Sequence, residues 1–465
     1  MRYYLAIDIG ASNGRHILGH VRDGVMYIEE INRFDNSPVV RDGQLRWDID
    51  ALLGEILRGM KKCKEIDKLP VSVGIDTWGV DFALLGSDGR LLGSVAAYRD
   101  KRTNGMDDKI YGIIPEYELY QRTGIQKLIF NTIYQLMAVK TYTPGVLNEA
   151  EHLLLLPCYL HYLLCGVMKN EYTHATTSQL VNIDTGDWDH ELISRCGYPA
   201  GIFDPIVPPG TKLGILTDRI KAEIGYDCAV VLPATHDTAS AVMAVPVTAG
   251  DALYISSGTW SLMGVECEWP DCSAESMRGN FTNEGGYGGR YRYLKNIMGL
   301  WMIQCVSREL GGAHTYAELC DMAARESIPS IVDCNDQRFF APDSMIDEIK
   351  KTCAETEQRL PQGAGEMAAV VYNSLVDYYH ATIGDLERLT GKTYEQIHII
   401  GGGAKAEYLN RLIAARTGRA VHAGPVEAAA IGNIMAQMIT AGEFSGLAEA
   451  RECVGRSFDI KIFNP

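Results

Sequence analysis

The sequence of 465 residues has a deficit of positive charge. Its 43 Lys and Arg residues are outnumbered by 59 Asp and Glu, which leaves a net charge of −16. This balance argues against a nucleic-acid partner, because a phosphate backbone attracts basic surfaces. It does not exclude a phosphorylated small molecule, which needs only a few local hydrogen-bond donors.

Long apolar runs are also missing. No stretch approaches the roughly 20 apolar residues that span a bilayer, and the short run Leu153–Leu156 ends at Pro157. The N-terminus has no basic segment followed by a long apolar one, so it is not typical of a secretory signal. We therefore expect a cytoplasmic protein with no membrane partner.

Paired cysteines are absent, although the chain has 12 Cys. No C-x-x-C motif occurs, and a chain of this length does not need disulfides for stability. Zinc sites usually require paired ligands at short spacing. We expect free thiols in a reducing compartment, no disulfide and no zinc site. The sequence leaves the oligomeric state open between a monomer and a homodimer.

The length exceeds that of one ordinary hydrophobic core, which favours two domains. The chain opens with two predicted strands, Tyr3–Ile9 and Arg15–Val21, joined by a turn of small residues. About 250 residues later a second such hairpin is predicted over Ala252–Ser257 and Thr259–Glu266. The repeat indicates an internal duplication with a cleft between the halves.

Pro, Thr and Gly cluster at Pro246–Gly250, where we place the boundary. The predicted domains are residues 1–245 and 246–465. Within the first, apolar spacing predicts a helix over Ala51–Cys63 with Asp50 as its N-cap.

The first turn, DIGASNGR, covers Asp8–Arg15. A glycine turn between strands exposes backbone N–H groups that can bind phosphate oxygens, and Ser12, Asn13 and Arg15 add donors. Asp8 offers the carboxylate oxygen that Mg²⁺ prefers. The motif is neither G-x-x-x-x-G-K-[ST] nor G-x-G-x-x-G opening a helix, so it is not a P-loop or a Rossmann site. An ordinary hairpin remains the alternative.

Two further turns fit a nucleotide. The second hairpin turns at Ser256–Thr259, with polar small residues in the place of the first turn. Three consecutive glycines, Gly401–Gly403, follow a predicted strand and let a ligand lie flat against the backbone. Polar β-turns with no ligand are the alternative for each.

The segment PATHDTASAV contains His236, Asp237 and Thr238 between a predicted strand and a helix of small residues. A kinase acting on a sugar hydroxyl needs a carboxylate that accepts the hydroxyl proton, and Asp237 lies near the predicted junction of the domains. The alternative is a helix cap beside an ordinary histidine.

Other polar residues fit a sugar-binding wall. Trp78 and Gly79 lie on a tight turn in GIDTWGVD, where an indole face could contact sugar C–H groups. Asn296 and Gln304 lie in KNIMGLWMIQ, on what should be the opposite wall. Trp78 could equally belong to the core, and the amides could serve helix packing.

Taken together, the motifs resemble those of the FGGY carbohydrate kinases, and among these the members that phosphorylate L-rhamnulose. The resemblance runs from the first strand to about Ile434, and the motifs that carry it are DIGASNGR, WDID, GIDTWGVDFALL, YRDKRTNG, YQRTGIQ, FNTIYQL, EYTHATTSQLVNI, THDTASAV, YISSGTWSLMG, NEGG, LKNIMGLW, GGGA and GPVEAAAIGNI.

The resemblance implies an α/β, actin-like (ribonuclease-H-like) fold of two duplicated domains, with MgATP and sugar bound in the interdomain cleft. It implies transfer of phosphate from ATP to the 1-hydroxyl of L-rhamnulose, with Asp237 as the catalytic base. The residues that would bind ATP are Ala11, Ser12, Asn13, Gly14, Arg15, Thr259, Gln304 and Gly402. The residues that would contact the sugar are Trp78, Gly79, His236, Asp237, Thr238 and Asn296. Asp8 would help to hold Mg²⁺.

Two alternatives stay open at this point. Another FGGY kinase, acting on fuculose or xylulose, would share the same phosphate-binding turns and base. An actin-like protein that binds ATP without a small-molecule acceptor would not need a carboxylate beside the γ-phosphate. A sugar sensor without catalysis is disfavoured by the intact turns and by Asp237.

Overall fold

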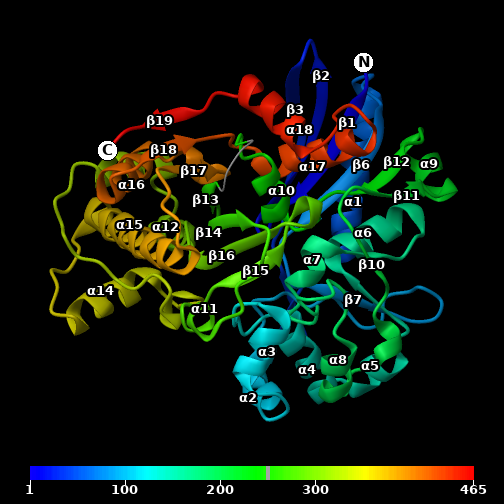
Figure 1. Cartoon of the computed structure of the whole chain (residues 1–465), viewed down its shortest axis with the longest axis horizontal. Coiled ribbons are helices and arrows are strands. Elements are labelled where there is room, and N and C mark those ends of the chain that lie inside the picture. Colours follow the sequence, from blue (N-terminus) through cyan, green and yellow to red (C-terminus); the bar gives the residue numbers. More distant parts are fainter. Residues whose placement is uncertain (248–251) are drawn as a thin grey trace. The chain divides into compact units, whose positions relative to one another are not determined.

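The computed structural model describes residues 1–247 and 252–465 (Figure 1). The chain forms two compact units. The first consists of Met1–Thr248, Cys267–Tyr293 and Ala429–Ser457, and the second of Ala249–Glu266, Leu294–Ala428 and Phe458–Pro465. Part of the predicted boundary segment, residues 248–250, lies outside the described residues. The predicted domains 1–245 and 246–465 stay a prediction.

The first unit is built on a six-stranded sheet in the order β11-β12-β6-β1-β2-β3. Its strands are β1 (Tyr3–Ile9), β2 (Asn13–Arg22), β3 (Val25–Asp35), β6 (Pro70–Thr77), β11 (Thr211–Ile215) and β12 (Ala229–Leu232). The first three form an antiparallel meander, whereas β1, β6 and β12 run parallel. The predicted opening hairpin is therefore confirmed.

Helices from distant parts of the sequence cover this sheet (Figure 1). They are α1 (Ile49–Glu65), α6 (Leu156–Cys165), α10 (Asp237–Met243), α17 (Ala428–Thr440) and α18 (Leu447–Ser457). The predicted cap of α1 was wrong by two residues, because the side chain of Asp48 accepts the hydrogen bond from the Ala51 N–H and Asp50 lies in the first turn.

The first unit also has a helical layer around its own apolar core. It comprises α2 (Met106–Tyr111), α3 (Glu116–Thr123), α4 (Thr132–Tyr142), α5 (Pro144–Glu149) and α8 (His190–Cys196). The short strands β7 (Phe82–Leu85) and β8 (His152–Leu155) pair beside these helices. This layer positions the turn that follows β6.

The second unit repeats the topology of the first. The strands of its sheet include, in order, β16 (Tyr291–Met298, which belongs to this unit from Leu294 on), β14 (Trp260–Cys267), β13 (Leu253–Ser257), β17 (Gln396–Ile400), β18 (Ala420–Ala423) and β19 (Lys461–Phe463). The strands β13 and β14 form an antiparallel hairpin, and β13, β17 and β18 run parallel, as β1, β6 and β12 do. This match supports an internal duplication.

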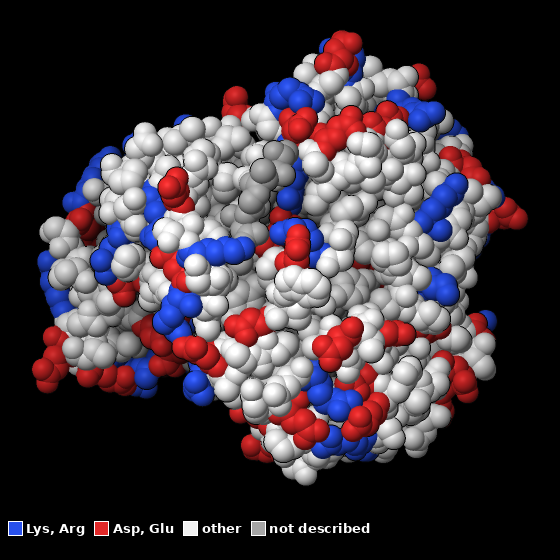
Figure 2. Space-filling model, in the orientation of Figure 1, with Lys and Arg blue, Asp and Glu red and all other residues white. Residues whose placement is uncertain are grey.

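The helices of the second unit are α12 (Trp301–Glu309), α13 (Tyr316–Ala323), α14 (Met345–Glu355), α15 (Gly363–Thr390) and α16 (Glu407–Thr417). The twelve cysteines of the chain are free thiols. Among the described residues, no helix combines the length and the apolar character that crossing a membrane requires. Acidic and basic side chains are interspersed over the face shown in Figure 2.

Candidate active site

Two hydrogen bonds from Asn36 hold the turn between β1 and β2. The Asn36 side chain donates to the carbonyl of Gly10 at 2.8 Å, and its backbone N–H donates to the carbonyl of Ser12 at 3.0 Å. The Gly10 N–H closes the turn on the carbonyl of Asn13 at 2.8 Å. Ser12 is exposed at the tip. The backbone of this turn is therefore fixed before any ligand arrives, as a phosphate-binding turn requires.

The corresponding turn of the second unit brings two predicted nucleotide-binding residues together. The hydroxyl of Thr259 lies 3.5 Å from Oε1 of Gln304, and the N–H of Trp301 donates to the carbonyl of Thr259 at 3.0 Å. Asn296 lies on β16, where its carbonyl accepts a hydrogen bond from Asn335.

The glycine turn after β17 packs against the same hairpin. Gly401 has φ +82°, a conformation that favours glycine, and a Cβ at Gly403 would lie 2.0 Å from Oγ of Ser257. A Cβ at Gly402 would meet no atom within 4 Å. Gly402 thus presents open backbone beside the hairpin turn of Ser257.

Two carboxylates lie side by side at the ends of β1 and β6, where Asp8 and Asp76 are partners in the parallel register. Asp8 is buried and forms an ion pair with Arg15, whose Nε lies 3.0 Å from Oδ2 of Asp8. Asp76 is fully buried, and Asn433 of α17 donates to its Oδ2 at 2.6 Å. Burial, together with the charge of Asp8, raises the pKa of Asp76 well above its usual value.

Asp237 is the first residue of α10, and His236 occupies the cap position. Oδ1 of Asp237 accepts hydrogen bonds from the N–H and the hydroxyl of Thr238, at 2.5 and 3.1 Å. Burial raises the pKa of Asp237, and the charge of Asp8 adds to this rise. The carboxylate still keeps 28% of its side-chain exposure, so a hydroxyl group can reach it.

A buried polar network fixes the backbone next to Asp237. At its centre is Glu171, which accepts hydrogen bonds from the N–H and hydroxyl groups of Thr173 and Thr235 at 2.7 to 3.0 Å. The N–H of His236 donates to the hydroxyl of Thr173 at 3.4 Å. Glu171 therefore connects the chain before α10 to the helix α7 (Tyr172–Thr176).

The ring of His236 lies between charged groups. Its Nδ1 is 3.0 Å from Nη2 of Arg292, and its Nε2 is 3.6 Å from Oδ1 of Asp237. The ring of His174 packs edge-on against it, with 6.0 Å between the ring centres. Burial lowers the pKa of His174 to about 3, so this neighbour is neutral.

The turn after β6 is held in a strained conformation. Val80 has φ +71°, which a β-branched residue rarely adopts, and its N–H donates to the hydroxyl of Thr177 at 3.2 Å. Such a conformation persists only where the surroundings determine it. Gly79 is half-buried beside it, at the position predicted to contact sugar.

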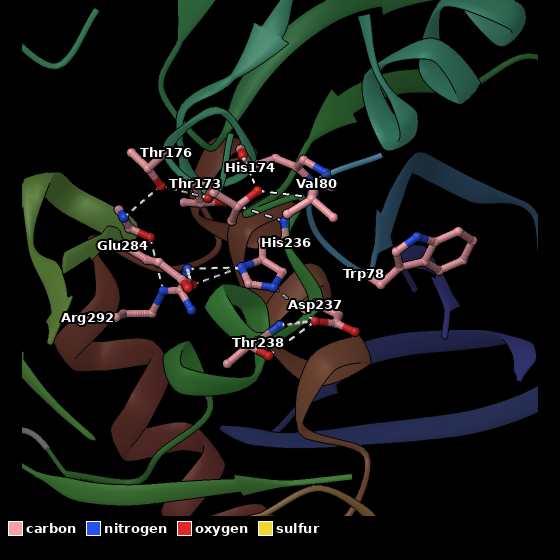
Figure 3. A network of polar contacts seen from close by, with 12 residues as sticks. Trp78, Val80, Thr173, His174, Thr176, His236, Asp237, Thr238, Glu284 and Arg292 are labelled. Carbon is pink, nitrogen blue, oxygen red and sulfur yellow. Dashed lines mark hydrogen bonds and ion pairs between the residues drawn. The ribbon is translucent and has the colours of Figure 1, made fainter. Parts of the chain in front are cut away.

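Trp78 is almost fully buried. Its indole N–H donates to Oδ2 of Asp81 at 2.8 Å, and its ring lies 4.2 Å from that of Trp47, centre to centre. The indole N–H of Trp47 donates to the same oxygen at 2.7 Å. In Figure 3, Trp78 lies beside the network around His236 and takes no part in its contacts.

The donor set at Asp8 and Asp76 fits a hard cation. Oδ1 of Asp76 has no hydrogen-bond partner among the described residues, although the residue is fully buried. Carboxylate oxygens are the ligands that Mg²⁺ prefers, usually one or two together with waters and phosphates. Within the described part of the chain no group of three or more His, Cys, Asp or Glu side chains is arranged for a metal. The residues therefore suit a metal that arrives with a nucleotide.

Comparison with known families shows the family to which this chain belongs. Residues 3–244 match the N-terminal domain of the FGGY family of carbohydrate kinases, and residues 253–441 match its C-terminal domain. The chain belongs to the FGGY family of carbohydrate kinases. The prediction of this family from its motifs is thus confirmed.

The chain is also similar over its full length to curated proteins. A rhamnulokinase of Halalkalibacterium halodurans is 46% identical over 463 residues, covering 100% of this chain and 99% of that protein. A rhamnulokinase of Oceanobacillus iheyensis is 46% identical over 459 residues, covering 99% of this chain and 97% of that protein.

A solved structure confirms the predicted fold class. The ligand-bound xylulose kinase from Lactobacillus acidophilus superposes with a TM-score of 0.83, covering 100% of this chain and 94% of that one. The sequence identity is 16%, so this likeness concerns the fold alone. The α/β, actin-like fold with two domains is the fold of this chain.

The structure groups the predicted residues by unit. In the first it brings together Asp237, His236 and Thr238, and it pairs Asp8 with Arg15. In the second it brings together Thr259 and Gln304. The roles assigned to these residues stay predictions.

Sequence reasoning missed four residues of the first unit. Asp76, Glu171, Glu284 and Arg292 are all buried, and each contacts a predicted residue or the backbone beside one. Three of them lie inside quoted motifs, namely GIDTWGVD, EYTHATTSQLVNI and NEGG. The acidic residues inside these three motifs were the available signal.

Proposed function

We propose that this chain is an ATP-dependent kinase that phosphorylates the 1-hydroxyl of L-rhamnulose, giving L-rhamnulose 1-phosphate and ADP. The observation that carries the proposal is 46% identity over essentially the full length of two curated rhamnulokinases. Membership of the FGGY family supports phosphate transfer to a carbohydrate.

In this proposal Asp237 is the catalytic base. Its carboxylate accepts the proton of the 1-hydroxyl as the hydroxyl oxygen forms a bond to the γ-phosphorus and the bond to ADP breaks. A raised pKa makes Asp237 a better proton acceptor than an ordinary aspartate. The hydrogen bonds from Thr238 hold the carboxylate in one orientation.

Six predicted residues would contact the ketose. These are Trp78, Gly79, His236, Thr238 and Asn296, together with Asp237. The rigid turn at Val80 and the Glu171 network support this role, because a positioned hydroxyl is what phosphoryl transfer chiefly requires.

ATP would be bound chiefly by backbone and uncharged side-chain donors, with few positive charges. The residues are Ala11, Ser12, Asn13, Gly14, Arg15, Thr259, Gln304 and Gly402. Asp8 would hold Mg²⁺, and the buried oxygen of Asp76 beside it fits the same ion. When bound, Mg²⁺ neutralises charge on the transferring phosphoryl group.

We also propose that the enzyme acts in the cytoplasm as a monomer or homodimer, with no nucleic-acid or membrane partner. In this proposal its two substrates are ATP and a free ketose.

A panel of ketoses tests the proposal. The purified protein is incubated with MgATP and L-rhamnulose, L-fuculose or D-xylulose, and ADP release is measured with a coupled assay. We expect the highest kcat/KM for L-rhamnulose. A higher value for another ketose would support the FGGY alternative, and no ketose-dependent ADP release would support an actin-like ATP-binding protein.

A further inference from the structure

A buried ion pair between Arg292 and Glu284 lies next to His236 in the first unit (Figure 3). Arg292, on β16, has no exposed surface, and its Nη2 lies 2.9 Å from Oε2 of Glu284. Its Nε donates to the carbonyl of Gly285 at 3.0 Å. Glu284 and Gly285 belong to β15 (Thr282–Gly285), which is held to α7 by a hydrogen bond from the N–H of Gly285 to Thr176. The guanidinium is therefore fixed on two sides.

The same guanidinium determines the tautomer of His236. Its Nη2 lies 3.0 Å from Nδ1 of His236. A guanidinium has donors and no acceptor, so Nδ1 must accept this hydrogen bond with its lone pair. The ring is then neutral, with its single proton on Nε2.

The opposite tautomer also has a possible partner, because Nδ1 lies 3.4 Å from Oε2 of Glu284. A proton on Nδ1 would, however, face the N–H of Arg292 across 3.0 Å. That repulsion, at the shorter of the two distances, favours the proton on Nε2.

The proton on Nε2 lies on the side of the catalytic carboxylate. Nε2 is 3.6 Å from Oδ1 of Asp237, which is too long for a hydrogen bond. Asp237 therefore does not accept a hydrogen bond from the Nε2–H group. This group can instead donate a hydrogen bond to an oxygen of the acceptor sugar. His174 is neutral and adds no charge beside the ring.

We infer that Arg292 and Glu284 are a positioning pair, which fixes His236 as the Nε2–H tautomer so that it donates a hydrogen bond to the ketose next to Asp237. This inference rests on the proposed function, because it assigns a partner to the sugar-binding His236. Neither Arg292 nor Glu284 needs to touch the substrate.

The tautomer is measured first, without substrate. Protein labelled with ¹⁵N in its 11 histidines is examined by NMR, and the His236 signals are assigned from their loss in His236→Gln. We expect an unprotonated Nδ1 and a protonated Nε2 in the wild type. A protonated Nδ1, alone or together with Nε2, would overturn the inference.

A double variant then removes the pair without leaving a buried charge. In Glu284→Gln/Arg292→Met both charges are lost, and this is tolerated better than the loss of one. We expect a mixture of His236 tautomers and a fall of kcat/KM for the ketose of about 10- to 100-fold, by analogy with the loss of a hydrogen-bond partner that orients a metal-binding histidine. The KM for MgATP should change less than about 2-fold, whereas a purely structural defect would affect both substrates.

Two further variants keep the test decisive. Arg292→Lys retains a donor for Nδ1 and should keep the Nε2–H tautomer with most of the ketose activity, even if the double variant fails to fold. Arg122→Met/Asp189→Asn removes another ion pair of the first unit, with its closest N–O distance at 2.8 Å, and should leave the tautomer and both KM values unchanged. Unchanged ketose kinetics in a folded double variant with mixed tautomers would overturn the positioning role.

The same measurements distinguish a failure of the proposed function from a failure of the inference about His236. If the wild type prefers another ketose, the kinetic comparison is made with that ketose and the tautomer result is unaffected. If it phosphorylates no ketose, the proposed function fails and the positioning role with it, whereas the tautomer assignment stands on the NMR result alone.

Discussion

Asp8 and Asp76 are partners in the parallel register of β1 and β6, so two carboxylates share one end of the first sheet. Arg15 forms an ion pair with Asp8. Asp76 is fully buried, accepts a hydrogen bond from Asn433 on one oxygen and has its pKa raised by burial and by Asp8. The pair therefore favours a proton on Asp76 when no cation is bound.

Asp76→Asn reproduces a protonated Asp76, since its amide can keep the contact to Asn433 and direct N–H toward Asp8. We expect the free energy of unfolding at pH 7 to change by less than about 1 kcal/mol. Asp76→Leu leaves the Asn433 amide without this partner and should cost about 1–3 kcal/mol. Urea unfolding followed by tryptophan fluorescence measures both. An equal cost for the two variants would show that Asp76 is ionised in the folded protein.

Asp237→Asn removes the proposed base but keeps an acceptor for the N–H of Thr238. We expect kcat for ketose phosphorylation to fall about 10²- to 10⁴-fold. MgADP binding, measured by titration calorimetry, should be unchanged because the nucleotide contacts are elsewhere. Turnover at the wild-type level would rule out Asp237 as the base.

The pH dependence gives an independent check on Asp237. A base works only when deprotonated, so kcat/KM should be full above the pKa of Asp237 and fall as the pH decreases through it. Burial raises this pKa above the usual aspartate value. Thr238→Val removes a hydroxyl that stabilises the ionised form, so the acid limb should move to higher pH. A limb that stays in place would mean that another group controls it.

Trp47 and Trp78 form a matched pair, because both donate to Oδ2 of Asp81 and only Trp78 is predicted to contact sugar. Replacing either by Phe removes one donor from a buried carboxylate and should lower the free energy of unfolding by about 1–3 kcal/mol. Only Trp78→Phe should raise the KM for the ketose. Equal KM values in both variants would assign Trp78 to the core alone.

His161 connects α6 to the sheet and should destabilise the protein in acid. Its Nε2 accepts the N–H of Ile75 at 3.0 Å and its Nδ1 contacts the carbonyl of Pro157 at 2.7 Å. Burial lowers its pKa to about 4, whereas the unfolded chain protonates near pH 6.5. Its contribution is therefore complete above about pH 6.5 and is lost as the pH falls toward 4.

The loss between pH 7 and pH 5 should be about 2 kcal/mol for this group. Urea unfolding at the two pH values, in the wild type and in His161→Gln, isolates it. The difference in unfolding free energy should be smaller in the variant by that amount. The same difference in both proteins would contradict a depressed pKa.

Gly432 and Gly384 are both helical glycines with opposite surroundings. A Cβ at Gly432 in α17 would lie 1.7 Å from the carbonyl oxygen of Ser240, whereas one at Gly384 in α15 would meet nothing within 4 Å. Gly432→Ala should destabilise the protein by about 1–3 kcal/mol or more. Gly384→Ala should stabilise it by about 0.5–1 kcal/mol through helix propensity. Thermal unfolding compares the two, and a tolerated Gly432→Ala would show that α10 and α17 can separate.

Local patterns were sufficient to predict the hairpins, because Tyr3–Ile9 and its neighbours are short, mostly apolar runs that end in small-residue turns. They misplaced the cap of α1, since Asp48 and Asp50 are equally good cap residues in sequence and only the backbone conformation selects Asp48. The pairing of β7 with β8 joins segments about 70 residues apart, which no local pattern encodes.

The candidate site shows the same difference between local motifs and contacts of residues far apart in the sequence. Asp237 and the glycine turns could be predicted because they lie in compact motifs with known chemistry. Arg292 could not, since its role depends on a histidine 56 residues earlier and on a buried glutamate. Asp76 looked like the end of an ordinary strand until its register with Asp8 was known.

The first unit recruits its helix α17 from the end of the chain, and this sets the order of events during synthesis. Gln437 of α17 donates to the carbonyl of Leu5 at 3.0 Å and accepts the hydroxyl hydrogen bond of Ser72 at 2.6 Å. At ribosomal rates of about 5–20 residues per second, α17 is synthesised roughly 20 s or more after β1 and β6. A nascent chain, or a fragment that ends at residue 244, therefore has an uncovered sheet that chaperones can bind, and the first unit is completed only after most of the second unit has been made.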